Sequence, residues 1–347
     1  MQRSFASDNN APIAPEILQA IVAANQGDAV GYGDDAWTLR ATARFREHFG
    51  DDTDVYFAFN GTGANIIALS CVTRPWEAVL TPSTAHLQVD ECGAFERFTG
   101  SKVIPITTAD GKLRIADIEP HLLAGRGEHH PQPRVISISN TTEWGDVYEL
   151  RELRELCAFA HDHDLIVHVD GARIANAAAA LGATPCEITK NVGVDVLTFG
   201  GTKNGLLGGE AVCFFHPEMS ENVGPYVRKQ AMQLASKMRY ISAQFEALLT
   251  DDRWLRYASH ANQVAQRLHA GVRDIPGVTI TRPVRANAIF ATLSREAIAR
   301  VQQQFFFYCF DEALPEVRWM THWATSDSDV DAFVAAVKSA ALSSRRE

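Results

Sequence analysis

Short apolar runs alternate with helical patterns through the middle of the chain. Helical spacing is clear in residues 63–72 and from Leu150 to His163. Seven apolar runs have the length and composition of strands, at residues 55–59, 78–82, 103–106, 135–139, 165–170, 195–199 and 211–215. Strands and helices in this order form right-handed βαβ crossovers, so the pattern predicts an α/β fold with a mainly parallel sheet covered on both faces.

Two amphipathic helices are predicted before the first strand. Apolar positions follow helical spacing in residues 15–26 and 37–49. The segment YGDD (residues 32–35) lies between them and is predicted to be a loop. The chain therefore begins with a segment that precedes the sheet.

The last part of the chain has a different pattern. A helical pattern from about Met219 to Leu249 is expected to lead away from the sheet and connect two lobes. Beyond it, predicted helices alternate with strand-like pieces, at residues 252–273, 278–282, 288–293, 294–304, 317–323 and 327–342. We therefore expect an N-terminal segment (1–35), a large α/β domain (36–249) and a small C-terminal α+β domain (250–347).

Composition is that of a folded protein and excludes several partners. The 347 residues are 46% apolar and 21% charged, which suits one large domain and a smaller one. Acidic residues outnumber basic ones by 42 to 32, and Lys and Arg are scattered, so no nucleic-acid partner is expected. The N-terminus has no signal-peptide pattern and no run of about 18 apolar residues occurs, so we expect a cytoplasmic protein without a membrane partner.

The cysteines and histidines do not predict a metal site. Six cysteines lie far apart without a C-x-x-C pair, so they are predicted to be buried thiols in a reducing compartment rather than disulfides or zinc ligands. His161 and His163 do not share a helix face, and neither they nor the pair His129 and His130 have an evident third ligand. No metal is expected.

Two strand ends carry the strongest chemical signal. In HVDGAR (168–173) a strand ends at Asp170, where open α/β sheets bind ligands, although a helix N-cap would have the same pattern. In TFGGTKNG (198–205) Lys203 lies in a glycine-rich turn, where a lone lysine is usually just solvated. Together they predict pyridoxal phosphate, with Lys203 as the Schiff-base amine and Asp170 at the pyridine nitrogen.

A third motif predicts a phosphate site. In FNGTGAN (59–65) a strand breaks into glycines and opens directly onto a helix, whose N–H groups and dipole attract anions. Gly61, Thr62 and Gly63 are the candidate cradle. The run lacks the third glycine of a dinucleotide fingerprint and the lysine of a P-loop, and a plain strand–helix turn is the alternative.

These motifs resemble the low-specificity L-threonine aldolases, fold-type I pyridoxal phosphate enzymes that include a phenylserine aldolase-like branch. The resemblance covers essentially the whole chain and rests on the segments FASDN (5–9), YGDD (32–35), FNGTGAN (59–65), AHLQVDECGA (85–94), HVDGAR (168–173), FGGTKNG (199–205), QLASKMR (233–239) and VRWMTH (317–322). It implies retro-aldol cleavage of β-hydroxy-α-amino acids, namely L-threonine, L-allo-threonine and phenylserine, to glycine and an aldehyde.

The resemblance also implies roles for individual residues. Lys203 holds the cofactor, and Asp170 keeps the pyridine nitrogen protonated through a charge-assisted hydrogen bond. His86 matches a histidine that stacks on the cofactor ring near the substrate hydroxyl. Arg173 and Arg318 match arginines that bind the cofactor or the substrate carboxylate, a task for which the guanidinium fork is suited.

Other implied residues lie near a subunit interface. Ser7 and Tyr32 match N-terminal residues near the substrate carboxylate and the phosphate. Arg239 resembles a residue that reaches a neighbouring subunit's phosphate, with Lys237 and Arg228 as substitutes. The resemblance implies a homotetramer built from dimers with shared active sites, and a two-fold symmetric dimer would satisfy the same contacts.

The groups around the substrate hydroxyl are the least defined. His129 matches a second substrate-side histidine, and His130 competes for that role. The base is predicted to be His86, His129 or a water held between them. The chain departs from the family pattern where NTTEWG (140–145) replaces a segment that usually carries a histidine, and at Ala324, where an aspartate often follows.

Other functions of the same fold are alternatives. β-Elimination, dehydration or racemisation of a small amino acid would use the same cofactor, since fold does not fix chemistry. A protein that binds the cofactor without turnover is a further alternative, which the complete set of reactive residues disfavours.

Overall fold

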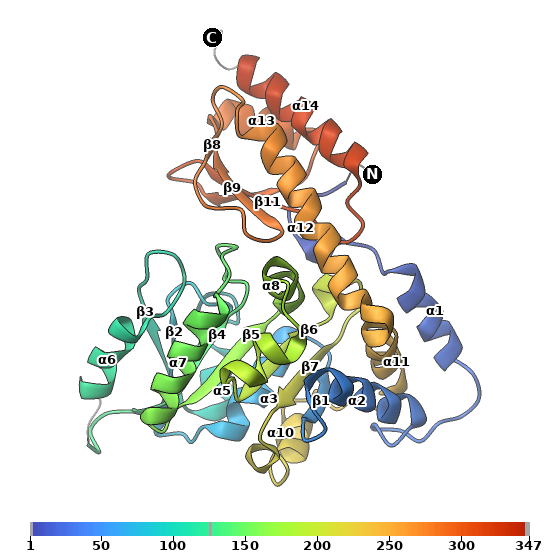
Figure 1. Cartoon of the computed structure of the whole chain (residues 1–347), viewed down its shortest axis with the longest axis vertical. Coiled ribbons are helices and arrows are strands. Elements are labelled where there is room, and N and C mark those ends of the chain that lie inside the picture. The colour runs from blue at the N-terminus through green and yellow to red at the C-terminus, as the bar shows by residue number, and fades with distance from the viewer. Residues whose placement is uncertain (1–2, 125–126, 344–347) are drawn as a thin grey trace.

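The computed structural model describes residues 3–124 and 127–343 and shows two lobes joined by a long helix (Figure 1). The larger lobe contains a seven-stranded sheet of β1 (Asp54–Ala58), β2 (Glu77–Pro82), β3 (Lys102–Ile106), β4 (Gln132–Ser139), β5 (Ile166–Gly171), β6 (Val196–Gly200) and β7 (Glu210–Phe214). The strand order is β1-β7-β6-β5-β4-β2-β3. Strands β6, β5, β4, β2 and β3 are parallel to one another, and β7 is antiparallel to both of its neighbours. All seven predicted strands, and the α/β class, are confirmed.

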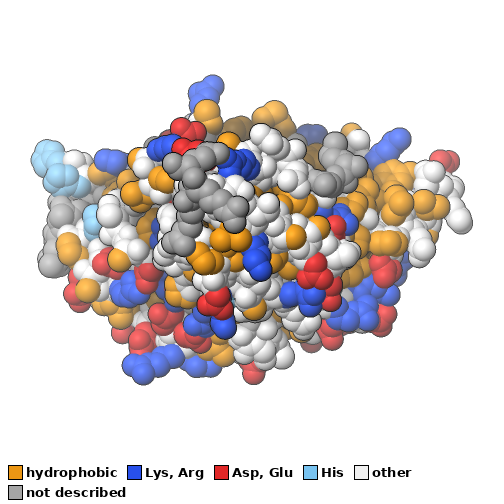
Figure 2. All heavy atoms as spheres, turned by 90° about the horizontal axis from the view of Figure 1, so that it is seen from above, with side chains coloured by type: hydrophobic (Ala, Val, Ile, Leu, Met, Phe, Trp, Pro, Cys, Tyr) orange, Lys and Arg blue, Asp and Glu red, His pale blue; other side chains and the backbone are white. Residues whose placement is uncertain are grey.

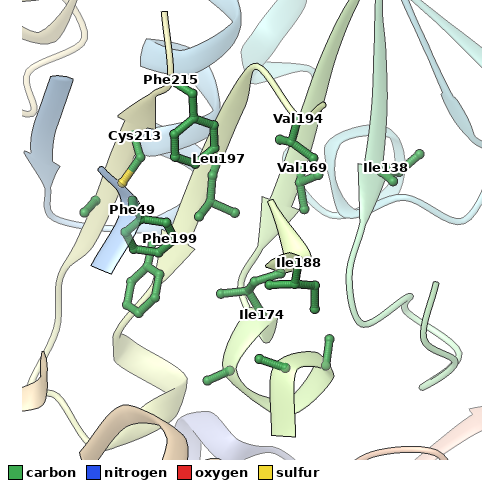
Figure 3. Packing of buried hydrophobic residues seen from close by; sticks show 14 of the residues in the cluster. Phe49, Ile138, Val169, Ile174, Ile188, Val194, Leu197, Phe199, Cys213 and Phe215 are labelled. Carbon is green, nitrogen blue, oxygen red and sulfur yellow. The ribbon is translucent and has the colours of Figure 1, made fainter. Parts of the chain in front are cut away.

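Helices cover both faces of this sheet because its strands bury alternate residues on opposite sides. Leu197 and Phe199 pack on one face with Phe49 and Phe215 (Figure 3), whereas Val196 packs on the other. The first face is covered by α1 (Pro15–Ala24), α2 (Ala36–Phe49), α7 (Leu150–Asp162), α8 (Ile174–Leu181), α9 (Pro185–Ile188) and α11 (Arg239–Leu249). The second face is covered by α3 (Gly61–Val72), α5 (Ala94–Thr99) and α10 (Gly224–Gln230). Helices α4 (His86–Val89) and α6 (Ile115–Ala124) also belong to this lobe.

The small lobe is an antiparallel sheet with helices packed on it. Its strands follow the order β10-β11-β9-β8, with β8 (Thr279–Ile280), β9 (Ala288–Thr292), β10 (Tyr308–Asp311) and β11 (Glu316–Met320). Its helices are α12 (Arg253–Val272), α13 (Arg295–Gln302) and α14 (Asp327–Ser343). Strand β10 was not predicted, because it overlaps the continuous apolar run FFFYCF, which has no alternation of apolar and polar residues.

The prediction of one long helix from Met219 to Leu249 is wrong. Helix α10 ends at Gln230, and α11 begins only at Arg239. Between them Met232 has a left-handed φ of 60°, which an α-helix cannot contain. The lobes are connected instead by α12, which runs from the large lobe into the small one (Figure 1).

The N-terminal segment crosses from one lobe to the other. Phe5 is buried in the core of the small lobe, where its N–H donates to Phe306 O and its carbonyl accepts from Met320 N. A 3-10 turn at Asp8–Asn10 follows, and α1 then packs on α11 in the large lobe. The residues from Phe5 to α1 therefore pass the space between the lobes.

The surface and the thiols agree in part with the sequence analysis. Within the described residues no helix is long and apolar enough to cross a membrane. On the face in Figure 2, acidic and basic side chains are intermixed. The six cysteines are free, but Cys92 is exposed and Cys186 and Cys309 are only partly buried, so the prediction that all are buried is wrong. Cys92 lies in a short connection between α4 and α5, where no sheet covers it.

Candidate active site

A cavity of about 550 Å³ opens between the lobes at the carboxyl ends of β4, β5 and β6. These strands contribute Ser139, Asp170 and Thr198 to its wall, as expected for an open α/β sheet. The cavity brings together seven residues predicted from sequence, namely Ser7, Gly61, His86, Asp170, Arg173, Lys203 and Arg318.

Asp170 is held as a carboxylate at the end of β5. Its Oδ1 accepts from Ala172 N at 3.0 Å, and its Oδ2 accepts from Asn65 Nδ2 at 2.9 Å. Burial alone would raise the pKa of Asp170, but these two hydrogen bonds and the charge of Lys203 lower it below its ordinary value. Behind it, burial lowers the pKa of His168 to about 4, so this histidine is neutral. Asp170 is therefore a buried carboxylate, which is suited to accept a hydrogen bond from a protonated ring nitrogen.

Lys203 reaches the same cavity from the turn after β6. A 3-10 turn, η3 (Thr202–Asn204), presents it next to Gly200 and Gly201. A Cβ at Gly200 would lie 2.4 Å from Ala172 O, so glycine is needed where the ends of β5 and β6 meet. Burial and the charge of Arg173 lower the pKa of the Lys203 amine. Its neutral form, which attacks an aldehyde, is correspondingly more accessible.

Glu210 is a buried carboxyl beside Lys203. Its Oε2 accepts from Gly201 N at 2.9 Å, which fixes the lysine turn to β7. Burial raises the pKa of Glu210 to about 7, although the hydrogen bond and the lysine charge oppose this. The raised pKa means that the fold favours the protonated form of Glu210. The contribution of Glu210 to the stability of the fold is therefore complete below pH 4.5 and is lost as pH rises to about 7.

We expect Glu210→Gln to remove this pH dependence from the cofactor-free protein. A pKa rise from 4.5 to about 7 changes the free energy of unfolding by on the order of 3 kcal/mol across this pH range. The variant should therefore gain thermal stability over the wild type as pH increases from 4.5 to 7, and the gain should then level off. Calorimetric unfolding across this range measures it, with the exposed Glu119→Gln as control. Parallel curves for wild type and Glu210→Gln would contradict the assignment.

His86 is linked to Asp170 through two buried side chains. His86 Nδ1 lies 2.8 Å from Glu91 Oε1, and Asn65 Nδ2 donates to that same oxygen at 2.8 Å and to Asp170 Oδ2. The hydrogen bond to Glu91 raises the pKa of His86, with burial acting against it. The contact with Glu91 therefore favours the protonated form of His86. Its backbone N–H donates to Glu143 Oε1 at 3.0 Å, which ties α4 to the loop after β4.

Two arginines in the cavity differ in their pairing. Arg173 binds Asp8 through Nε at 2.7 Å and Nη2 at 2.8 Å. Arg318 forms no salt bridge within the described residues, and its Nε is buried there without a hydrogen-bond partner. Burial and the nearby Arg173 charge lower the pKa of Arg318. An unpaired guanidinium in a cavity is a strong site for a carboxylate.

The start of α3 fits a phosphate group. Asn60 caps the helix by accepting from Gly63 N at 2.8 Å, which leaves the N–H groups of Gly61 and Thr62 to bind an anion. Apart from the adjoining residues and backbone of α3, no atom of the described residues lies within 4 Å of the place where a Cβ on Gly61 would be, so the cavity has room there. With an amine, a ring-nitrogen partner and this cradle, the residues present fit pyridoxal phosphate.

Four predicted residues do not line the cavity of a single chain. Tyr32 is exposed in the loop before α2, and Arg239 Nη1 donates to Gly27 O at 2.9 Å. His129 lies in an exposed turn before β4, a strand's length from the carboxyl end of the sheet. Thr62 lies beside Gly61 at the helix start without lining the cavity. Within the described residues, no three His, Cys, Asp or Glu side chains form a metal cluster.

The structure adds functional candidates that the sequence analysis did not assign. Asn65, Glu91, Glu143 and Glu210 all line the cavity. Burial raises the pKa of Glu143, whose Oε1 also accepts from Ser139 Oγ at 2.6 Å. A usable signal existed for Asn65, a single amide in the otherwise apolar helix GANIIALSCV. The acidic residues carried no such signal, because acidic side chains in loops and at strand ends are ordinarily solvated.

Known proteins match the chain over nearly its full length. A family model described as beta-eliminating lyase matches residues 4–296. A low specificity L-threonine aldolase of Pseudomonas sp. (strain NCIMB 10558) is 44% identical over 97% of this chain and 97% of its own length. The enzyme of that name from Pseudomonas aeruginosa is 44% identical over 95% and 94%. A solved structure of Leishmania major threonine aldolase superposes with a TM-score of 0.91 at 33% identity, covering 97% of this chain and 98% of its own.

Proposed function

The chain belongs to the low-specificity L-threonine aldolases of the beta-eliminating lyase family, and from that premise we propose that it is a pyridoxal phosphate-dependent aldehyde-lyase. Its reaction is the cleavage of β-hydroxy-α-amino acids, L-threonine and L-allo-threonine among them, to glycine and an aldehyde. The observation that carries this is a single cavity shared by the Lys203 amine, the Asp170 carboxylate and the unpaired Arg318 guanidinium.

The chain's residues divide the work of holding the cofactor. Lys203 would bond to its aldehyde carbon, Asp170 would keep its ring nitrogen protonated, and the N–H groups of Gly61 and Thr62 would bind its phosphate. His86 would lie beside its ring. When bound, pyridoxal phosphate supplies an electron sink for the pair released as the Cα–Cβ bond breaks.

The substrate is held by its carboxylate and deprotonated at its hydroxyl. Arg318 and the unpaired Nη1 of Arg173 bind the carboxylate from the small and large lobes, and Ser7 lines the cavity near them. Fixing the carboxylate orients the Cα–Cβ bond for cleavage. His86 can hold the proton that leaves the β-hydroxyl, because Glu91 stabilises its charged form.

Turnover of L-threonine tests the function. We expect glycine and acetaldehyde in equal amounts from the cofactor-loaded enzyme. Pyruvate and ammonia would identify a β-eliminating enzyme, and loss of optical activity without cleavage would identify a racemase. Running both threonine diastereomers and phenylserine measures the side-chain preference.

We further propose a cytoplasmic homotetramer, a dimer of dimers that shares active sites. Large apolar side chains are exposed on α1, on α2, in the loop between them and at two positions before α11, namely Leu18, Val22, Val30, Tyr32, Leu39, Leu207 and Met232. Exposed apolar side chains of this kind favour a subunit interface. Tyr32, Arg239 and His129 then serve a neighbouring subunit's cavity, and the unpaired thiols suit a reducing compartment.

Mixing two inactive variants tests the shared sites. Lys203→Ala damages a subunit's own cavity, and Arg239→Ala damages its partner's. A hybrid dimer then contains one intact cavity, so random mixing should restore roughly a quarter of wild-type activity. Activity of the mixture is measured after subunit exchange, with each variant alone as control. No recovery, with hybrids confirmed by native mass spectrometry, would place Arg239 outside the partner's site.

A further inference from the structure

Asp8 holds Arg173 by one edge of its guanidinium. The carboxylate accepts from Nε at 2.7 Å and from Nη2 at 2.8 Å, and these two bonds fix the plane of the group. The third nitrogen, Nη1, makes no hydrogen bond within the described residues. Asp8 therefore determines which edge of Arg173 remains available.

The lining of the cavity and the exposure of the two side chains indicate that the available edge is on the cavity side. Ser7, Asn9 and Arg173 line the cavity, but Asp8 is not among its lining residues in the described part of the chain. The Asp8 side chain is 1% exposed, against 15% for Arg173. Asp8 thus approaches Arg173 from the protein interior and does not occupy the place where a ligand would bind.

Asp8 is itself fixed by the small lobe. Asn287 Nδ2 donates to Asp8 Oδ2 at 3.1 Å and to Thr321 O at 2.9 Å. The preceding Phe5 is buried in the small-lobe core, so Asp8 joins that lobe to an arginine at the start of α8. Burial would raise the pKa of Asp8, but the charge and hydrogen bonds of Arg173 lower it to about 2, so the pair is ionised at neutral pH.

We propose that Asp8 is a positioning residue for carboxylate recognition, which orients Arg173 so that its Nη1 acts together with Arg318 on the substrate carboxylate. The inference rests on the proposed function. It assigns the two arginines different tasks: Arg318 is the unpaired anchor, and Arg173 is a preoriented second donor. Losing the Asp8 charge should weaken binding of ligands that carry a carboxylate and spare those that do not.

Two probes that react with the cofactor aldehyde measure this selectively. Aminooxyacetate carries a carboxylate and methoxyamine does not, and each changes the visible absorption of the holoenzyme at a measurable second-order rate. We expect Asp8→Asn to reduce the aminooxyacetate rate about 10-fold or more and to leave the methoxyamine rate within about twofold. In an Arg173→Gln background, Asp8→Asn should change neither rate, because its effect acts through Arg173.

Unfolding of the cofactor-free protein gives a second measurement. Asp8→Asn leaves Arg173 buried without its counter-ion and should lower the unfolding temperature at pH 7, and adding Arg173→Gln should recover part of the loss. A wild type that does not distinguish the two probes contradicts the proposed function itself. A wild type that distinguishes them, with an Asp8→Asn variant that does so equally well, overturns this inference alone. So does an Asp8→Asn effect that persists in the Arg173→Gln background.

Discussion

Replacing Lys203 with alanine should abolish covalent cofactor binding and lower threonine cleavage by at least about 10³-fold. Lys203 lies in the cavity beside Asp170, and burial lowers the pKa of its amine, which suits it to react with an aldehyde. Alanine removes the amine and adds no bulk to the turn. The cavity should therefore keep its shape while losing its reactive group.

Borohydride reduction followed by mass spectrometry measures the covalent bond directly. Wild type should gain the mass of one reduced cofactor on the peptide that contains Lys203, and Lys203→Ala should gain none. Lys338→Ala, on an exposed position of α14, is the matched control and should behave as wild type. A reduced adduct on a different lysine of the wild type would show that the cofactor is held elsewhere.

The large lobe could be predicted from sequence because its strands are buried on both faces. Such strands are continuous apolar runs, and all seven coincide with observed strands. Asp170 and Lys203 follow the carboxyl ends of two of these strands. The sequence therefore predicted that they lie at the same edge of the sheet, where the carboxyl ends of parallel strands meet. The helix break at Met232 was not predictable in this way, because its cause is a left-handed backbone at a non-glycine residue.

The polar network around the cavity depends on contacts that have no sequence pattern. Asn65 joins Glu91 to Asp170, and these residues lie on α3, in the loop after α4 and on β5. Asp8 and Arg173 are 165 positions apart along the chain. Their pairing follows from the path of the N-terminal segment over both lobes, which no local periodicity encodes.

The fold of one chain does not test roles that depend on a neighbouring subunit. Tyr32, Arg239 and His129 do not line the cavity of their own chain, so this fold neither requires nor excludes such roles for them. These roles remain proposals, and the hybrid-dimer experiment separates Arg239 from residues that act within a subunit.

Asp170→Asn should lower kcat for threonine by roughly 10²–10³-fold while the covalent bond to Lys203 persists. Asparagine is nearly isosteric but neutral, so it cannot stabilise a protonated ring nitrogen. It also has a single side-chain oxygen, whereas Asp170 accepts from both Ala172 N and Asn65 Nδ2. One of these donors therefore loses its partner in the variant.

Steady-state kinetics together with borohydride trapping separates this effect from loss of the cofactor. Asp164→Asn is a matched control, because Asp164 is exposed and its left-handed φ of 57° suits asparagine equally well. Asp170→Asn should retain the adduct and lose turnover, whereas Lys203→Ala loses both. An Asp170→Asn enzyme with turnover within about threefold of wild type would mean that the ring nitrogen does not face this carboxylate, since removing a charge-assisted hydrogen bond in a water-excluded site costs far more than that.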